Sequence, residues 1–89
     1  MRIVITIIGQ DRVGIVARVS NVLAEHNVNI LDINQNIMNG FFNMVMIADM
    51  GGASMALKEL QQLLKDEGQN IGVEIKVQHE DIFKIMHRI

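Results

Sequence analysis

The 89-residue sequence predicts an α+β domain in which two helices cover one face of a four-stranded antiparallel sheet. Three observations support this class. Runs of β-branched residues alternate with helical stripes of apolar residues, an Asn-Gly pair marks a central hairpin, and hydrophobic residues make up 49% of the chain. That share can fill a hydrophobic core, and the length suits one domain, residues 1–89.

A strand and a helix are predicted at the N-terminus. Residues 2–8, RIVITII, are apolar on both alternating faces, which is typical of a central strand covered on both sides. The period then becomes helical and predicts a helix over residues 12–26. Its apolar stripe consists of Ile15, Val16, Val19, Val22 and Leu23. Asp11 stands where a cap would accept backbone N–H groups, and Asn27 stands where a left-handed residue often ends a helix.

A β-hairpin is predicted in the middle of the chain. Residues 28–38 alternate apolar and polar side chains, which is typical of a strand with one solvent-exposed face. Asn39-Gly40 supplies the two positive-φ residues of a type I′ turn, so residues 41–49 return antiparallel. Both faces of this returning strand are apolar, which favours a central position in the sheet.

A second helix, a last strand and a short C-terminal helix are predicted in the second half. Gly51-Gly52 end the hairpin, and Gly68 is the predicted stop of the second helix. The apolar stripe of this helix consists of Ala53, Ala56, Leu57, Leu60, Leu63 and Leu64. Residues 72–79 alternate again as a half-buried strand, and residues 80–88 have apolar side chains at the spacing of a helix.

The predicted order βαββαβ defines a ferredoxin-like sandwich with strand order 4-1-3-2, because right-handed crossovers place both helices on one face of the sheet. The two strands that are apolar on both faces then become central. Their other face would expose an apolar stripe, which monomers seldom do. We expect the C-terminal helix to cover this stripe, within one chain or shared between two subunits, and a second subunit is the alternative cover.

Charge and composition exclude several classes of function. Eight Lys and Arg against ten Asp and Glu give a net charge of -2, so the basic field that binds nucleic-acid phosphates is missing. The absence of cysteine excludes disulfides, thiolate catalysis and Cys-based metal sites, and it agrees with a cytoplasmic location. The first apolar run is too short for a secretion signal, and no run is long enough to span a membrane.

The sequence offers no recognisable catalytic or metal-binding set. It has no Ser-His-Asp arrangement and no phosphate-cradling glycine motif, so we predict neither enzymatic activity nor a cofactor. His79, Glu80 and Asp81 are adjacent, and neighbours on an extended chain point to opposite faces, so they do not predict a metal site. His87 and Arg88 are better explained by the dipole at the end of the last helix.

The turn between the first strand and the first helix is the strongest candidate for a binding site. The free amides of a helix N-terminus attract a carboxylate or a phosphate, and Asp11 can pair with an ammonium group. Together they could bind both the carboxylate and the ammonium group of an amino acid. The alternative is purely structural, with Asp11 as a cap and Gly14 as a residue that lets the helix approach the strand.

The segment DRVGIV after a β-branched strand, followed by the helix and NVNILDINQ, resembles the ACT-domain family over essentially the whole chain. The resemblance implies a regulatory module that binds a small ligand, often an amino acid, and pairs through sheet edges or helices. It is strongest to the small free-standing members, which lack an attached catalytic domain. It implies a ligand site between two subunits, lined by Gln10, Asp11, Gly14 and Ile15 of one chain and by Asn29 and Ile30 of its neighbour.

Two positions depart from that family. Val13 stands where many relatives have proline, and Asp11 stands where serine-binding relatives have asparagine, so the identity of the ligand stays open. For Asn29 the alternative is the role of a turn residue after the first helix.

The predicted function is that of a non-enzymatic, cytoplasmic sensor that forms a homodimer and acts on a regulated protein of unknown identity. The dimer seam is either the edge strand at residues 28–38 or a helix face. A protein–protein interaction module that needs no ligand is the alternative function.

Overall fold

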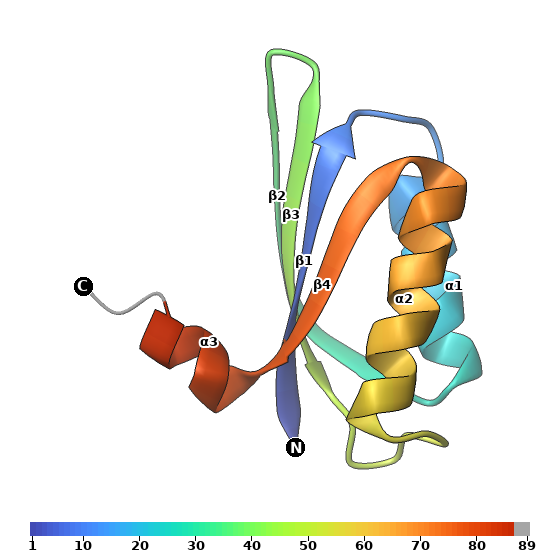
Figure 1. Ribbon diagram of the computed structural model, residues 1–89, viewed down its shortest axis with the longest axis vertical. Coiled ribbons are helices and arrows are strands. Elements are labelled where there is room, and N and C mark those ends of the chain that lie inside the picture. The colour runs from blue at the N-terminus through green and yellow to red at the C-terminus, as the bar shows by residue number, and fades with distance from the viewer. Residues whose placement is uncertain (87–89) are drawn as a thin grey trace.

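The computed structural model describes residues 1–86 and contains one four-stranded antiparallel sheet (Figure 1). The elements in chain order are β1 (Arg2–Gln10), α1 (Ile15–Glu25), β2 (Asn29–Met38), β3 (Phe41–Asp49), α2 (Leu57–Ile71), β4 (Val73–His79) and α3 (Glu80–Met86). The strand order β2-β3-β1-β4 is the predicted 4-1-3-2 order, so the ferredoxin-like prediction is confirmed. The roles expected for His87 and Arg88 lie outside the described residues.

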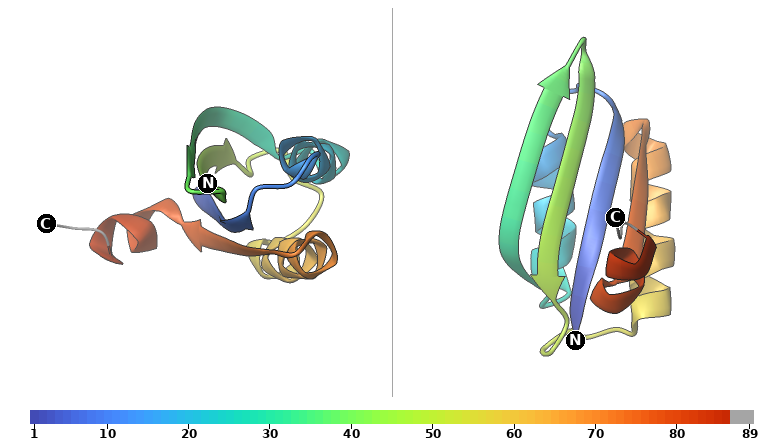
Figure 2. Two further views of the ribbon diagram at one scale, coloured as in Figure 1. Left: turned by 90° about the horizontal axis from the view of Figure 1, so that it is seen from above. Right: turned by 90° about the vertical axis from the view of Figure 1, so that its left-hand side faces the viewer.

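The hydrophobic core lies between the sheet and the two long helices. Figure 2 shows α1 and α2 against one face of the sheet and α3 on the other. Along each strand, successive side chains point alternately to the core face and to the outer face of the sheet. The side chains buried most deeply are Ile3, Ile5, Ile7, Ile15, Val19, Leu23, Met44, Met46, Leu60 and Leu64.

Two left-handed turns agree with the sequence. Asn39 and Gly40 have φ angles of 52° and 81°, as the predicted hairpin turn requires. Asn27 has a φ of 58°, so the chain does leave α1 through a left-handed residue.

The beginning of α1 differs from the prediction. Gly14, with a φ of 88°, is the residue that precedes the first helical residue, so the helix starts at Ile15 rather than near residue 12. The proposal that Asp11 caps this helix is wrong. Asp11 lies too early in the loop for that role, and its backbone N–H instead donates to the carbonyl oxygen of Gly40 at 2.9 Å.

The bounds of α2 also differ from the prediction. The helix begins at Leu57, where the Glu59 carboxylate accepts the N–H of Ala56 at 3.3 Å. Gly68 does not end it. The helix continues to Ile71, and Gly72, with a φ of 92°, ends it by donating its N–H to the Gly68 carbonyl at 2.7 Å. Gly68 is instead buried against β4, where an added Cβ would lie 2.6 Å from the Val73 carbonyl oxygen.

The third helix covers only part of the outer face of the sheet. Val4, on that face, is 3% exposed, whereas Ile8, four residues further along β1 on the same face, is 53% exposed. The expectation that the C-terminal helix covers the whole apolar stripe therefore holds near Val4 and fails near Ile8. The reason is length, because α3 starts directly after His79, which is opposite Ile3, and its seven residues span only about 10 Å.

Asp49, at the end of β3, makes a pH-dependent contribution to stability. Its carboxylate accepts the N–H of Gly51 at 2.9 Å and lies 3.5 Å from the ammonium group of Met1. The Gly51 hydrogen bond is the main cause that holds the pKa of Asp49 below its ordinary value. A lowered pKa gives stability that is present above the ordinary pKa and is lost as the pH falls through the folded-state pKa.

We therefore expect Asp49→Asn to be less stable than the wild type near neutral pH. The difference should shrink as the carboxylate is protonated, and urea denaturation at about pH 6 and about pH 2 measures it. Asp66→Asn is a suitable control, because it removes the same charge from an exposed carboxylate that makes no ion pair within residues 1–86, whereas Asp49 lies near the Met1 ammonium group. A stability difference at Asp49 that does not change with pH would contradict this assignment.

Candidate binding site at the start of helix α1

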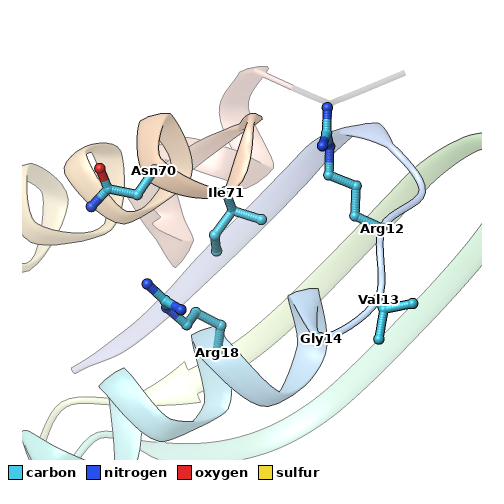
Figure 3. A pocket seen from close by; sticks show the side chains of 6 residues that line it. All are labelled: Arg12, Val13, Gly14, Arg18, Asn70 and Ile71. Atoms are coloured by element: carbon cyan, nitrogen blue, oxygen red, sulfur yellow. The ribbon is translucent and has the colours of Figure 1, made fainter.

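A hollow of about 450 Å³ lies where the β1–α1 loop and the first turn of α1 face the end of α2 (Figure 3). It is lined by Arg12, Val13, Gly14, Arg18, Asn70 and Ile71. Figure 3 shows Arg12 rising from the loop on one side, with Arg18 and Asn70 on the other. Two guanidinium groups and one amide therefore surround an open space at a helix N-terminus.

The local sequence leaves the start of α1 open. Within residues 1–86 no side chain hydrogen-bonds to the cap, and the first turn of the helix contains no acidic residue. The described atoms also leave at least 4 Å free around a Cβ built at Gly14. The first-turn N–H groups thus carry a partial positive charge that no acidic residue of that turn compensates, and Gly14, just before them, lines the hollow.

The two arginines are held by α2 in different ways. Arg18 Nε lies 3.3 Å from Oε2 of Glu67, an ion pair that links the two long helices. The Arg12 guanidinium lies against the C-terminal end of α2, where a Cβ added to Gly72 would be 3.4 Å from its Nε. That helix has no basic residue in its own last turn, so Arg12 complements the negative end of the dipole from outside. Both side chains can donate hydrogen bonds toward an anion.

Sequence reasoning did not single out Arg12 and Arg18 as site residues. Exposed arginines occur throughout protein surfaces and carry no periodic signal. A usable signal was the spacing of Arg18, four residues after Gly14, which places its side chain above the start of the helix. The part of the hollow contributed by Asn70 depends on where α2 ends, and the sequence placed that end at Gly68.

Of the residues predicted on the loop side, Gly14 lines the hollow. Gln10 is the exposed last residue of β1, and Asp11 is exposed in the loop that follows. Ile15 is 1% exposed and belongs to the hydrophobic core. The side chain of Ile15 is therefore closed to a ligand, and Ile15 does not line the hollow.

Within one chain, Asn29 and Ile30 lie at the end of the sheet opposite to the β1–α1 loop. Asn29 is opposite Asp49 in the sheet, whereas Gln10 is opposite Phe41. The eleven residues of α1, about 16 Å long, separate the two ends. Asn29 is exposed, and Ile30 is half-buried against the core. One chain does not bring the two predicted halves of the site together.

The histidine and acidic residues near the start of α3 make other contacts. Glu80 pairs with Arg2 at 3.2 Å and with Lys84 at 3.5 Å. The backbone N–H of Asp81 donates to Nδ1 of His79 at 3.1 Å. In the described part of the chain, no three metal-ligating side chains come together, and no helix is long and apolar enough to cross a membrane.

Comparison with known proteins identifies the family. A family model described as ACT domain matches residues 1–78. A UPF0237 protein of Methanosarcina mazei is 54% identical over 88 residues, which cover 99% of this chain and 96% of that protein. A UPF0237 protein of Methanocaldococcus jannaschii is 53% identical over 88 residues, with coverages of 99% and 98%.

The chain belongs to the ACT-domain family.

A solved ACT domain protein from Streptococcus pneumoniae agrees with this. It is 33% identical, has a TM-score of 0.83 and is matched over 94% of each chain. The resemblance seen in DRVGIV and NVNILDINQ is thus confirmed. Membership supports a regulatory, ligand-binding and non-catalytic role for this ACT domain. The match to the family model ends at residue 78, so α3 is an addition to the part of the ACT domain that the model matches.

Proposed function

We propose that this ACT domain is a non-enzymatic, cytoplasmic sensor that binds an amino acid at the junction of two subunits and passes its occupancy to a partner protein. The observation that carries the proposal is the open start of α1, which faces a hollow lined by two arginines. The lack of cysteine supports the cytoplasmic location.

The chemistry of the hollow suits the carboxylate of an amino acid. The first-turn amides of α1 supply directed donors, and Arg12 and Arg18 supply positive charge. Asp11, exposed in the same loop, supplies the negative charge that an ammonium group requires. A ligand with both charges is therefore favoured over a simple anion, which Asp11 would repel.

A two-fold pairing of β2 would complete the site. This strand is at the edge of the sheet and is exposed from Leu31 to Met38, so its outer backbone groups are available for pairing. When two such strands pair antiparallel, the first residues of one lie beside the last residues of the other. The β1–α1 loop is tied to that last part through Asp11 and Gly40. Asn29 and Ile30 of a second copy would then lie beside the loop.

Titration calorimetry with the standard amino acids tests the proposal. We expect one or a few to bind, and we expect Asp11→Ala and Asn29→Ala each to weaken binding about tenfold to a hundredfold, as the loss of a hydrogen bond to a charged group does. Gln69→Ala, an exposed polar residue on α2, is the matched control and should bind as the wild type does. Binding that survives both site variants would contradict the proposed site.

Subunit mixing tests the junction itself. A mixed dimer of Asp11→Ala and Asn29→Ala chains contains one site with both changes and one site with neither. The mixture should therefore regain about a quarter of the wild-type sites at full affinity, whereas two defective single-chain sites would regain none. If no amino acid binds, and the chain instead co-purifies with a protein from its native cell, the ligand-free interaction module is the better description.

A further inference from the structure

Within residues 1–86, the outer face of the sheet, opposite α1 and α2, has an exposed apolar area. Figure 2 shows α3 over only one end of this face. Toward the other end, Ile8 and Phe41 are exposed and Val45 is half-buried. A hollow of about 370 Å³ lies on this face, lined by the apolar side chains of Ile8, Val45 and Phe83 and by the polar residues Thr6, Asn43, Lys76 and Gln78. A second hollow of about 300 Å³ shares Ile8 and extends to Met38 at the hairpin end.

An apolar ridge stands directly beside these hollows. On α3, Phe83 is turned toward the sheet, whereas Ile82 is 53% exposed and Ile85 is 72% exposed. Figure 1 shows α3 projecting from the sheet on the side away from the other helices. The same face thus carries both an outward apolar ridge and a hollow with an apolar part formed by Ile8, Val45 and Phe83.

We propose that a second copy of this chain docks on this face, with α3 of each copy in the hollow of the other. A two-fold axis that runs across the strands, midway between two facing sheets, places each ridge over the opposite hollow. The lengths agree. The seven residues of α3 span about 10 Å. The part of β1 from Thr6 to Gln10 that α3 leaves uncovered spans about 13 Å.

The size and rim of the face suit a stable dimer. The molecule measures 35 × 34 × 20 Å, and the outer face in Figure 2 presents the longest and shortest of these dimensions. Its flat outline of roughly 700 Å² is close to the roughly 800 Å² that each partner buries in a standard interface. The rim carries both signs of charge. Glu74 pairs at 3.5 Å with Lys76, which also lines the hollow, and Lys84 pairs with Glu80 on α3, so these four charges are compensated within each copy.

Disulfide trapping tests the arrangement, because the chain contains no cysteine of its own. Equal amounts of the variants Ile8→Cys and Ile85→Cys are mixed and oxidised mildly, and the linked peptides are identified by mass spectrometry. We expect a disulfide between position 8 of one chain and position 85 of another. Gln69→Cys, exposed on the helix side of the molecule, replaces Ile8→Cys in the control. An 8–85 yield no higher than the 69–85 yield would overturn the proposal.

Sedimentation equilibrium of the double variant Ile82→Lys/Ile85→Lys gives an independent test. Both side chains are exposed, so the fold should survive, and circular dichroism verifies this. We expect the mass of the assembly to be halved, from tetramer to dimer if β2 also pairs and from dimer to monomer if it does not. The double variant should keep amino-acid binding, so this proposal and the proposed function can fail separately. An unchanged mass, or a wild type that is monomeric at high concentration, would overturn it and leave a different protein as the occupant of this face.

Discussion

Replacing Ile5 by alanine is expected to lower the free energy of unfolding by about 2–5 kcal/mol. Ile5 is 0% exposed in the middle of β1, between Met46 of β3 and Val77 of β4, on the face that α1 and α2 cover. The packed helices cannot close around the missing atoms, so a cavity adds to the loss of buried apolar area. Since a domain of this size is stable by roughly 4–13 kcal/mol, urea denaturation followed by circular dichroism should show a large shift.

Ile8→Ala is the matched control for Ile5→Ala. The same change is made in the same strand, but on the outer face, where the side chain is half exposed. We expect it to cost less than about 1 kcal/mol of stability. It should instead weaken the docking of a second copy. Equal losses for the two variants would show that the outer face near Ile8 is packed like the core.

Gly68→Ala is the second substitution with a large expected effect. Whether it raises or lowers the free energy of unfolding shows which of two opposing effects is larger. Inside a helix, alanine is normally more favourable than glycine by about 1 kcal/mol. Here the added Cβ would lie 2.6 Å from the Val73 carbonyl oxygen and 3.1 Å from Cγ1 of Ile75. The nearer atom belongs to the backbone, so α2 and β4 must separate. We expect a net loss of about 1–3 kcal/mol, measured as a lower melting temperature or urea midpoint.

Gln69→Ala controls for helix propensity in that experiment. It is next to Gly68 on α2 and exposed, so it changes the side chain without touching β4. We expect its stability to stay within about 0.5 kcal/mol of the wild type. A Gly68→Ala protein that is as stable as Gln69→Ala would show that the close approach of α2 and β4 is not needed.

Hydrophobic periodicity predicted the architecture because burial alternates differently in strands and helices. Strands β1 and β3 are apolar on both faces since they lie in the middle of the sheet, and this placed them correctly. Glycine was harder to interpret, because the same residue type can end a helix in the left-handed conformation or allow a helix to pack closely against a strand. Gly68 was assigned the first role and has the second, whereas Gly72 has the first.

The candidate site was only partly predictable for a related reason. Gly14 belongs to a local motif and was found, but the hollow also depends on the start of α1 lying beside the end of α2, and this brings in Arg12, Arg18 and Asn70. No local pattern in the sequence encodes that meeting. The coverage by α3 was overestimated because a helical stripe gives the direction of apolar side chains and not the distance that the helix can reach.

The hydrogen bond from the Asp11 N–H to the Gly40 carbonyl has a consequence for signalling. It couples the first loop mechanically to the tip of the β2–β3 ribbon, two segments that are far apart in the sequence. A molecule that displaces the loop must either break this tether or tilt the ribbon with it. If the proposed ligand displaces the loop, the β2–β3 ribbon would move with it, and a regulated protein that contacts the ribbon could respond to occupancy of the hollow.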